Sequence, residues 1–404
     1  MIKNQLQRSI FVFAALLFAS MLAVEAQAQQ VVTVTGTTGE GAQYEFTVPD
    51  NWNKDLVVWV HGILDPALPV DLITDDSQGM IGLRNGLLAR GYAFAYSTFS
   101  ENGYAVKDGV QRTHQLRGLF ISEFGKPNHT FLYGISMGGG ITIALLEKFP
   151  GQYDGALCES GIVGGGLPEF EYLTNGRVLY DVFYSSGAFP YQSPSFIPYP
   201  LPGDAGHPVT LPFSSNPASP GFPAFYGVAG NLIAGGVPRL FDYLQTAQIP
   251  ANPAEAFSSA IFVIGFNLIY MEDALLARTH HRLAIDNTQT VYHDPLNPSY
   301  DPLINLVADR FSSSPDAVNY LDNYFSPTGM IHAPVYTIHA TRDPIVPGWH
   351  ESLFAEKVAA AGRSEFLAQK SYNRWGHLSF TEQERLEAFD ALISWIVTGV
   401  KPAP

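Results

Sequence analysis

The sequence is almost without cysteine: Cys158 is the only one in 404 residues. No intramolecular disulfide can form, so the folded chain is held together by its hydrophobic core alone. Cysteine and histidine show no spacing typical of a zinc site, and no glycine-rich loop has the pattern of a phosphate-binding loop. We therefore expect neither a metal nor another cofactor.

Positive charge is scarce as well. The 22 lysines and arginines stand against 37 aspartates and glutamates, and the formal net charge is −15. A surface of this sign repels nucleic acids and anionic membranes, so we expect neither as a partner. A small molecule is the expected partner, and the composition leaves the oligomeric state open.

One long apolar run stands at the N-terminus, and no other stretch is long and apolar enough to cross a bilayer. Ile10–Val24 follows Lys3 and Arg8 and precedes the small-residue sequence Ala26-Gln27-Ala28. This order is typical of a signal peptide, so we predict that residues 1–28 are removed and that the mature protein is secreted or periplasmic, without a membrane attachment. A retained anchor is the alternative, disfavoured because the apolar run is short for a bilayer span.

Strand-like and helix-like segments alternate in two parts of the chain, 29–160 and 334–404. The alternation predicts one α/β domain with a mostly parallel sheet, helices on both faces and ligands at the carboxyl ends of the strands. The predicted strands are Val31–Gly36, Tyr44–Val48, Asp55–Val60, Gly91–Thr98, His129–Tyr133, Tyr153–Cys158, Pro334–Ala340 and Phe366–Tyr372. Helices are predicted over Val106–Glu123 and Gly139–Phe149 and from about Thr381 onwards.

The alternation stops between residues 161 and 333. Pro190–Pro223 contains ten prolines, too many for a helix or a central strand, and helix-like segments flank it at Leu167–Tyr184 and Ala254–Arg282. We predict a cap, or lid, inserted after the sixth strand. A disordered linker and a second independent domain are the alternatives, the first disfavoured by the many aromatic residues.

A lid over the strand ends encloses the reacting centre and favours a discrete molecule over a polymer surface. The abundant phenylalanine and tyrosine favour a substrate with an aromatic or hydrophobic group. The segment 97–104 follows the fourth predicted strand and therefore faces the same edge of the sheet. Glu101 or Tyr104 is predicted to contact substrate there, with a solvated loop as the alternative.

The sequence Gly134-Ile135-Ser136-Met137-Gly138 lies between an apolar run and a helix-like run. A strand that turns sharply into a helix exposes the central side chain, and small residues two positions before and after relieve the crowding. A glycine-rich turn without any chemistry gives the same pattern, so partners are needed to decide. The setting predicts Ser136 as the nucleophile.

The partners of a reactive serine follow further along the chain. A serine hydroxyl needs a histidine to take its proton, and that histidine needs a carboxylate that fixes its tautomer. Asp343 lies on the loop after Pro334–Ala340, and His377 ends the loop after Phe366–Tyr372. We predict Asp343 as the orienting acid and His377 as the general base.

Each assignment has an alternative. Asp343 precedes a proline, and in the alternative interpretation it only caps a helix that begins near Gly348. His350 competes as the base, although it falls inside that helix. Glu159, just after the sixth strand, competes as the acid.

The chain order Ser, Asp, His resembles that of the α/β-hydrolase superfamily over Val31–Cys158 and Pro334–Val400. The sequence His61-Gly62-Ile63 resembles the loop of lipases and esterases in which the residue after the glycine donates its amide to the oxyanion. The resemblance implies Met137 and Ile63 as the two oxyanion donors. It also implies that His61 supports the loop and does not react.

The chain looks like a secreted esterase, with some likeness to the feruloyl esterase and tannase group, although it lacks the cysteine pair that this group often carries. The implied activity is hydrolysis of carboxylic esters through an acyl-enzyme on Ser136. A serine peptidase of the prolyl-oligopeptidase type is the first alternative; such peptidases usually carry the cap ahead of the hydrolase domain. A ligand-binding protein without activity is the second.

Overall fold

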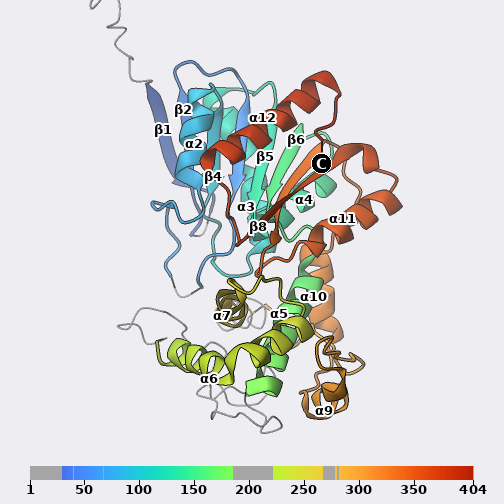
Figure 1. Ribbon diagram of the computed structural model, residues 1–404. Coiled ribbons are helices and arrows are strands. Elements are labelled where there is room, and N and C mark those ends of the chain that lie inside the picture. Colours follow the sequence, from blue (N-terminus) through green and yellow to red (C-terminus); the bar gives the residue numbers. More distant parts are fainter. Residues whose placement is uncertain are drawn as a thin grey trace, which may run out of the picture.

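The described strands form one eight-stranded sheet (Figure 1). The computed structural model describes residues 30–39, 41–66, 68–184, 222–266, 278–279 and 282–403, so the predicted signal peptide lies outside the described residues. The strands are β1 Val31–Thr37, β2 Gln43–Pro49, β3 Leu56–Val60, β4 Ala93–Ser97, β5 Thr130–Ile135, β6 Gly155–Glu159, β7 Val335–Arg342 and β8 Leu367–Trp375. Their order in the sheet is β1-β2-β4-β3-β5-β6-β7-β8.

The sheet is antiparallel only at one edge, where β2 pairs with β1 and with β4. All other neighbours are parallel. Every residue of β3, β4, β5 and β6 is buried, which explains why these strands read as continuous apolar runs in the sequence. The predicted mostly parallel sheet is confirmed.

Helices cover both faces of the sheet. The helices α2, Met80–Ala89, and α12, Glu382–Thr398, pack together on one face. On the other face lie α3, Val106–Phe124, α4, Met137–Lys148, and α11, Trp349–Ala360. Each face buries its own apolar cluster against the sheet, so the layers are those of an α/β domain.

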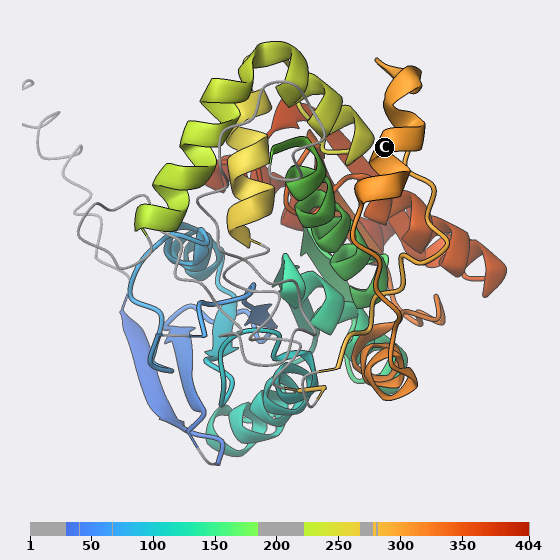
Figure 2. The same ribbon diagram turned by 90° about the horizontal axis from the view of Figure 1, so that it is seen from below.

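The span between β6 and β7, called the insertion below, adds five described α-helices (Figures 1 and 2). They are α5 Gly166–Tyr184, α6 Phe222–Thr246, α7 Ala256–Phe266, α9 Asp301–Val307 and α10 Pro315–Phe325. The predicted helix-like segment Ala254–Arg282 is wrong at its C-terminal end, because Arg278 and Thr279 form a turn. Most of the proline-rich segment Pro190–Pro223 lies outside the described residues.

The insertion sits at the end of the sheet where β7 and β8 finish. The guanidinium of Arg342, the last residue of β7, donates to both carboxylate oxygens of Glu255, just before α7. The indole nitrogen of Trp375, the last residue of β8, donates to the hydroxyl of Ser259 in α7 at 2.9 Å. These contacts place α7 over the carboxyl ends of the strands, where parallel sheets bind ligands.

Candidate active site

Ser136 is the single residue between β5 and α4. Its backbone angles are φ 52° and ψ −123°, a conformation that side-chain-bearing residues rarely adopt. A Cβ on Gly134 would overlap Thr142 and the carbonyl of Gly138, and a Cβ on Gly138 would overlap the carbonyl of Val60. The two glycines of the predicted motif are therefore required by the close approach of β5, α4 and β3 at this turn.

The structure brings Ser136, His377 and Asp343 together. The Ser136 Oγ and the Nε2 of His377 are 2.9 Å apart, and the Nδ1 of His377 is 2.7 Å from the Oδ2 of Asp343. Because a carboxylate only accepts, the His377 proton lies on Nδ1, and Nε2 is left to accept from the serine hydroxyl. The three side chains thus form a continuous hydrogen-bonded chain in which His377 can take the serine proton and Asp343 can stabilise the resulting charge.

Asp343 is fully buried, and its other oxygen accepts from the backbone N–H groups of Ile345 and Val346 at 2.9 and 3.0 Å. Burial opposes ionisation, but the attraction and hydrogen bond of His377, with smaller help from His339 and the backbone, lower the pKa of the Asp343 carboxyl. The acid is therefore held as a carboxylate. These backbone bonds close a turn ahead of α11, whose N-cap is Gly348 without any side-chain cap, so the capping alternative is wrong.

A second buried histidine, His339, lies beside Asp343 and was not found from the sequence. Its Nδ1 is 3.0 Å from the Oε1 of Glu351 and its Nε2 is 2.7 Å from the carbonyl of Val346. Both partners only accept, so both ring nitrogens carry protons. Burial disfavours that charge, but Glu351 and, less strongly, Asp343 raise the pKa of His339 above its ordinary value. His339 sits inside an apolar strand, which reads as core.

The rival acid and base have other partners. Glu159 is fully buried and accepts from the Arg385 guanidinium through both oxygens and from the Tyr133 hydroxyl. His350 accepts the backbone N–H of Gly164 at Nδ1, so its Nε2 donates to a carboxylate oxygen of Glu169 at 2.9 Å. The hydrogen bonds of the Ser136 hydroxyl and the His377 ring reach neither Glu159 nor His350.

The two predicted oxyanion donors, Met137 and Ile63, line the same cavity as Ser136. Within the described chain, neither backbone N–H has a hydrogen-bond partner. Gln78 holds the loop between His61 and Ile63, because its amide oxygen accepts from Gly62 N–H and its nitrogen donates to the Ile63 carbonyl. Two unpaired donors beside a nucleophile suit a developing negative charge.

His61 supports this loop through a hydrogen bond to its backbone. The ring is buried and stacks on Phe99 at 3.8 Å between centroids, and its Nδ1 donates to the Gly62 carbonyl at 2.6 Å. Burial is the largest cause that lowers the pKa of His61 to about 4, so the ring is neutral. It has no contact with Ser136 or His377 that would give it a part in proton transfer.

The cavity at Ser136 is small, about 30 Å³, and mostly apolar. Its described lining comes from both parts of the chain: Ile63, Tyr104, Ser136, Met137 and Val346 from the core, and Ile162, Glu169, Phe170, Leu173 and Phe266 from the insertion. Tyr104, a predicted substrate contact, belongs to this lining. Glu101 does not belong to the described lining, and its carboxylate pairs with Arg278, so the geometry gives that prediction no support.

In the described part of the chain, no three metal-ligating side chains are grouped to hold a metal. The helices described there are all too short or too polar to cross a bilayer.

The sheet order, the elbow and the helices on both faces are those of the α/β-hydrolase fold, and the site geometry at the elbow supports a hydrolase. No family model matches the chain. A curated relative, the o-phthalyl amidase of Xanthobacter agilis, is 23% identical over 126 residues, which cover 30% of this chain. The match spans only 26% of the amidase.

Solved structures with a similar course of the chain include three hydrolases. Feruloyl esterase B from Aspergillus oryzae has a TM-score of 0.48 at 13% identity, with 93% of this chain and 82% of that chain covered. An esterase of Pyrococcus furiosus has 0.44 at 12%, covering 93% of both chains. The acylaminoacyl peptidase of Pyrococcus horikoshii has 0.45 at 10%, covering 95% of this chain and 44% of that one. All three TM-scores are below 0.5, and the fold is defined by the sheet order of the chain itself.

Proposed function

We propose that the chain is a serine hydrolase that cleaves carboxylic esters through an acyl-enzyme on Ser136. The observation that carries the proposal is the hydrogen-bonded chain from the Ser136 hydroxyl through His377 to Asp343. The unpaired amides of Met137 and Ile63 beside the same cavity complete the parts that acyl transfer needs.

The reaction proceeds in two steps. The Ser136 oxygen attacks the ester carbonyl while the Nε2 of His377 takes its proton, and the Met137 and Ile63 amides bind the resulting oxyanion. His377 then gives the proton to the leaving alkoxide as the carbon–oxygen bond breaks, which leaves the acyl group on Ser136. Water, deprotonated by His377, repeats the attack and releases the acid. Asp343 stabilises the imidazolium in both steps.

The insertion is proposed to select the substrate. Phe170, Leu173 and Phe266 supply apolar walls to the cavity at Ser136. A substrate with an aromatic or hydrophobic group gains contacts there that a small ester lacks. Phe170→Ala is expected to raise KM for an aromatic-acid ester more than for an acetate ester, whereas equal effects on both would indicate general damage to the site.

Amide hydrolysis is the second candidate, favoured by the similarity to the o-phthalyl amidase. The same residues serve it, with a nitrogen leaving group that must be protonated by His377. The serine peptidase alternative is also a form of amide hydrolysis. We prefer the ester to the peptidase because the insertion lies within the hydrolase core, between β6 and β7, and not ahead of it.

A substrate screen of the purified protein tests the proposal. The probes are p-nitrophenyl acetate and butyrate, methyl esters of aromatic acids, an N-phthalyl amide and a peptide amide, each with the Ser136→Ala variant as control. We expect turnover of esters that the variant lacks. Cleavage of amides but not esters would move the assignment to an amidase or peptidase, and no turnover of any probe would favour a binding protein. We also propose secretion or periplasmic export, which N-terminal sequencing of the exported protein tests.

A further inference from the structure

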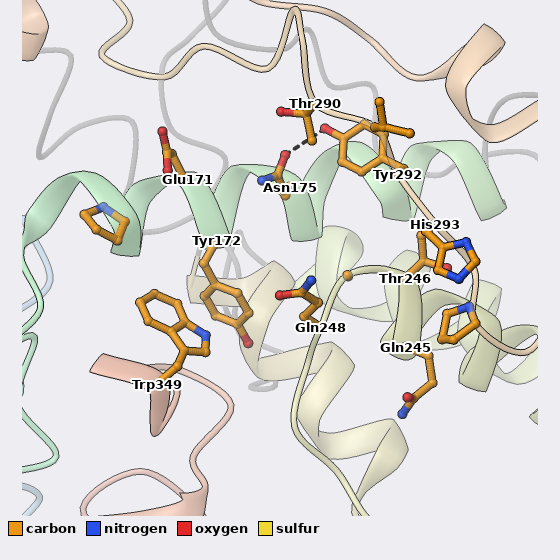
Figure 3. Close-up of a pocket in the computed structure, with 14 residues that line it drawn as sticks. Glu171, Tyr172, Asn175, Gln245, Thr246, Gln248, Thr290, Tyr292, His293 and Trp349 are labelled. Carbon is orange, nitrogen blue, oxygen red and sulfur yellow. Dashed lines mark hydrogen bonds between the residues drawn. The ribbon is translucent and has the colours of Figure 1, made fainter. Parts of the chain in front are cut away.

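A second cavity, of about 410 Å³, lies on the other side of α5 from the cavity at Ser136. Figure 3 shows its lining. The helix α5 separates the two. Its residues Glu169, Phe170 and Leu173 line the small cavity at Ser136, whereas the larger one is lined by Pro168, Glu171, Tyr172 and Asn175. The rest of the larger lining comes from the end of α6, from the segment 290–295 and from Trp349. Its volume falls in the range of ordinary small-molecule sites.

Fixed aromatic rings form one side of the larger cavity. The Trp349 ring stacks on His350 through one face, at 4.2 Å between centroids, and Tyr172 meets it edge-on at 6.0 Å. Tyr172 is itself held, because its hydroxyl donates to the Pro344 carbonyl at 2.7 Å. Figure 3 shows both rings on the same side of the cavity, opposite His293. Rings held in this way give apolar surface at little entropic cost.

Polar groups with unused hydrogen-bonding capacity face these rings. Within the described chain, the side chains of Gln245, Gln248 and Thr290 have no hydrogen-bond partner, nor does the Trp349 indole N–H. Asn175 accepts from the Tyr292 hydroxyl at 2.7 Å, which leaves its amide nitrogen to donate elsewhere. Gln248 lies in the middle of the view in Figure 3 and has a left-handed backbone, φ 56°. Carboxamides both donate and accept, so they suit a ligand that does both.

Charge excludes an anionic ligand. No lysine or arginine occurs among the described lining residues. His293 is already paired with Asp301 at 2.6 Å, and the Glu171 carboxyl lies at the cavity wall. An anion would lack a free cation to bind and would meet carboxyl groups.

We propose that this cavity is a second ligand site, which binds a neutral polyhydroxylated molecule such as a sugar ring. Ring hydroxyls donate to and accept from Gln245, Gln248 and Asn175, and the C–H face of the ring packs on Trp349 and Tyr172. The site requires no reaction at Ser136, because α5 stands between the two cavities.

Binding is measured on the Ser136→Ala protein, so that turnover plays no part. Isothermal titration calorimetry with xylose, glucose and cellobiose is paired with the change in tryptophan fluorescence. N-acetylglycinamide serves as a neutral peptide-like probe and sodium phosphate as an anionic one. We expect saturable binding of at least one of the sugars and none of phosphate.

Two variants locate the binding. Gln248→Gly removes the amide and suits the left-handed backbone, and Asn175→Asp keeps the acceptor for Tyr292 but loses the donor. Each is expected to weaken sugar binding roughly fivefold or more, the usual effect of one lost hydrogen bond. Gln383→Ala, an exposed amide on the distant α12, is the matched control and should change nothing (Figure 1). Gln245→Ala replaces any variant that fails to fold by circular dichroism.

Three results overturn the proposal: no saturable binding of any sugar up to its solubility limit, whether or not N-acetylglycinamide binds; equal binding by the cavity variants and the Gln383→Ala control; or saturable binding of phosphate that the cavity variants weaken. None of these touches the proposed hydrolase, which is tested by the ester screen alone.

Discussion

The pairs His377–Asp343 and His350–Glu169 both lie near the cavity at Ser136 and differ in what surrounds them. In the core, His377 contacts Asp343 at 2.7 Å; between α11 and the insertion, His350 contacts Glu169 at 2.9 Å. The pKa of Asp343 is lowered by its charged and donating neighbours against its own burial. Burial dominates the other pair, raising the pKa of Glu169 well above its ordinary value and lowering that of His350 well below it.

The difference teaches that a histidine next to a carboxylate is not by itself a base. What matters is the second ring nitrogen. The Nε2 of His377 faces the Ser136 hydroxyl, whereas the Nδ1 of His350 is already occupied by the backbone N–H of Gly164. Only the first pair is placed to take a proton from the Ser136 hydroxyl, so the chemistry is proposed for that pair, while Glu169 of the second pair lines the cavity.

The largest effect is expected at the nucleophile. Ser136→Ala should lower kcat on the best ester roughly 10⁶-fold, because the hydroxyl supplies the attacking atom and little packing. Steady-state kinetics measure it, and an unchanged thermal melt shows that the fold is kept. Ser160→Ala is the matched control, since Ser160 also has a positive φ, 47°, at the end of a neighbouring strand and its hydroxyl has no described partner. Residual activity near wild type in Ser136→Ala would remove Ser136 from the mechanism.

The comparison of the two pairs is tested directly by neutralising each carboxylate. Asp343→Asn should cost on the order of 10⁴-fold in kcat, because the amide presents a donor to His377 and disfavours the reactive tautomer. Glu169→Gln should change kcat less than about tenfold, because no proton of the reaction passes through His350. Kinetics on one short ester measure both variants. A larger loss in Glu169→Gln would reverse the assignment.

Another buried carboxylate, Glu159, tests whether a buried ion pair outside the Ser136–His377–Asp343 group supports the fold and not the reaction. Arg385→Met leaves Glu159 charged and unpaired in the core and should lower the free energy of unfolding by about 3–5 kcal/mol. Urea denaturation measures it. The double variant with Glu159→Gln should recover part of the loss, and Arg84→Met, which breaks the more exposed pair with Glu45, should cost at most about 1 kcal/mol. A large loss of activity with unchanged stability in Arg385→Met would contradict a supporting role.

The smallest effect concerns pH and the charge on His339. Its folded-state pKa is raised, mainly by Glu351 against burial, so its contribution is fully present below the unfolded value near 6.5 and is lost as pH rises through the higher folded value. Stability should fall by on the order of 1 kcal/mol over that rise. Urea denaturation between neutral and alkaline pH measures it. In His339→Gln this decline should be absent; an identical decline would mean that another group titrates.

Much of the site is visible in the sequence because its parts are local patterns. The elbow is five consecutive residues, and Asp343 and His377 each follow a predicted strand. The predicted sheet was confirmed for the same reason, since a buried parallel strand needs only a continuous apolar run.

The helix α2 was not predicted from the sequence, because it contains Gly82 and Gly86, which lower helix propensity. The structure shows their use: a Cβ at either position would press on Glu382 or Leu386 of α12, so the glycines allow the two helices to pack closely. The low helix propensity of α2 is thus a consequence of its close contact with α12, which exists only in the folded chain.

The sequence by itself determined the strand order along the chain, the elbow and the residue types of the acid and the base, because each depends on near neighbours. The tertiary structure decided which histidine meets which carboxylate, since His377 joins Asp343 across 34 positions and Ser136 across 241. It also decided that the pKa of His339 is raised and that α5 divides two cavities. Hydrogen bonds and burial between distant segments set these properties, and no local pattern carries that information.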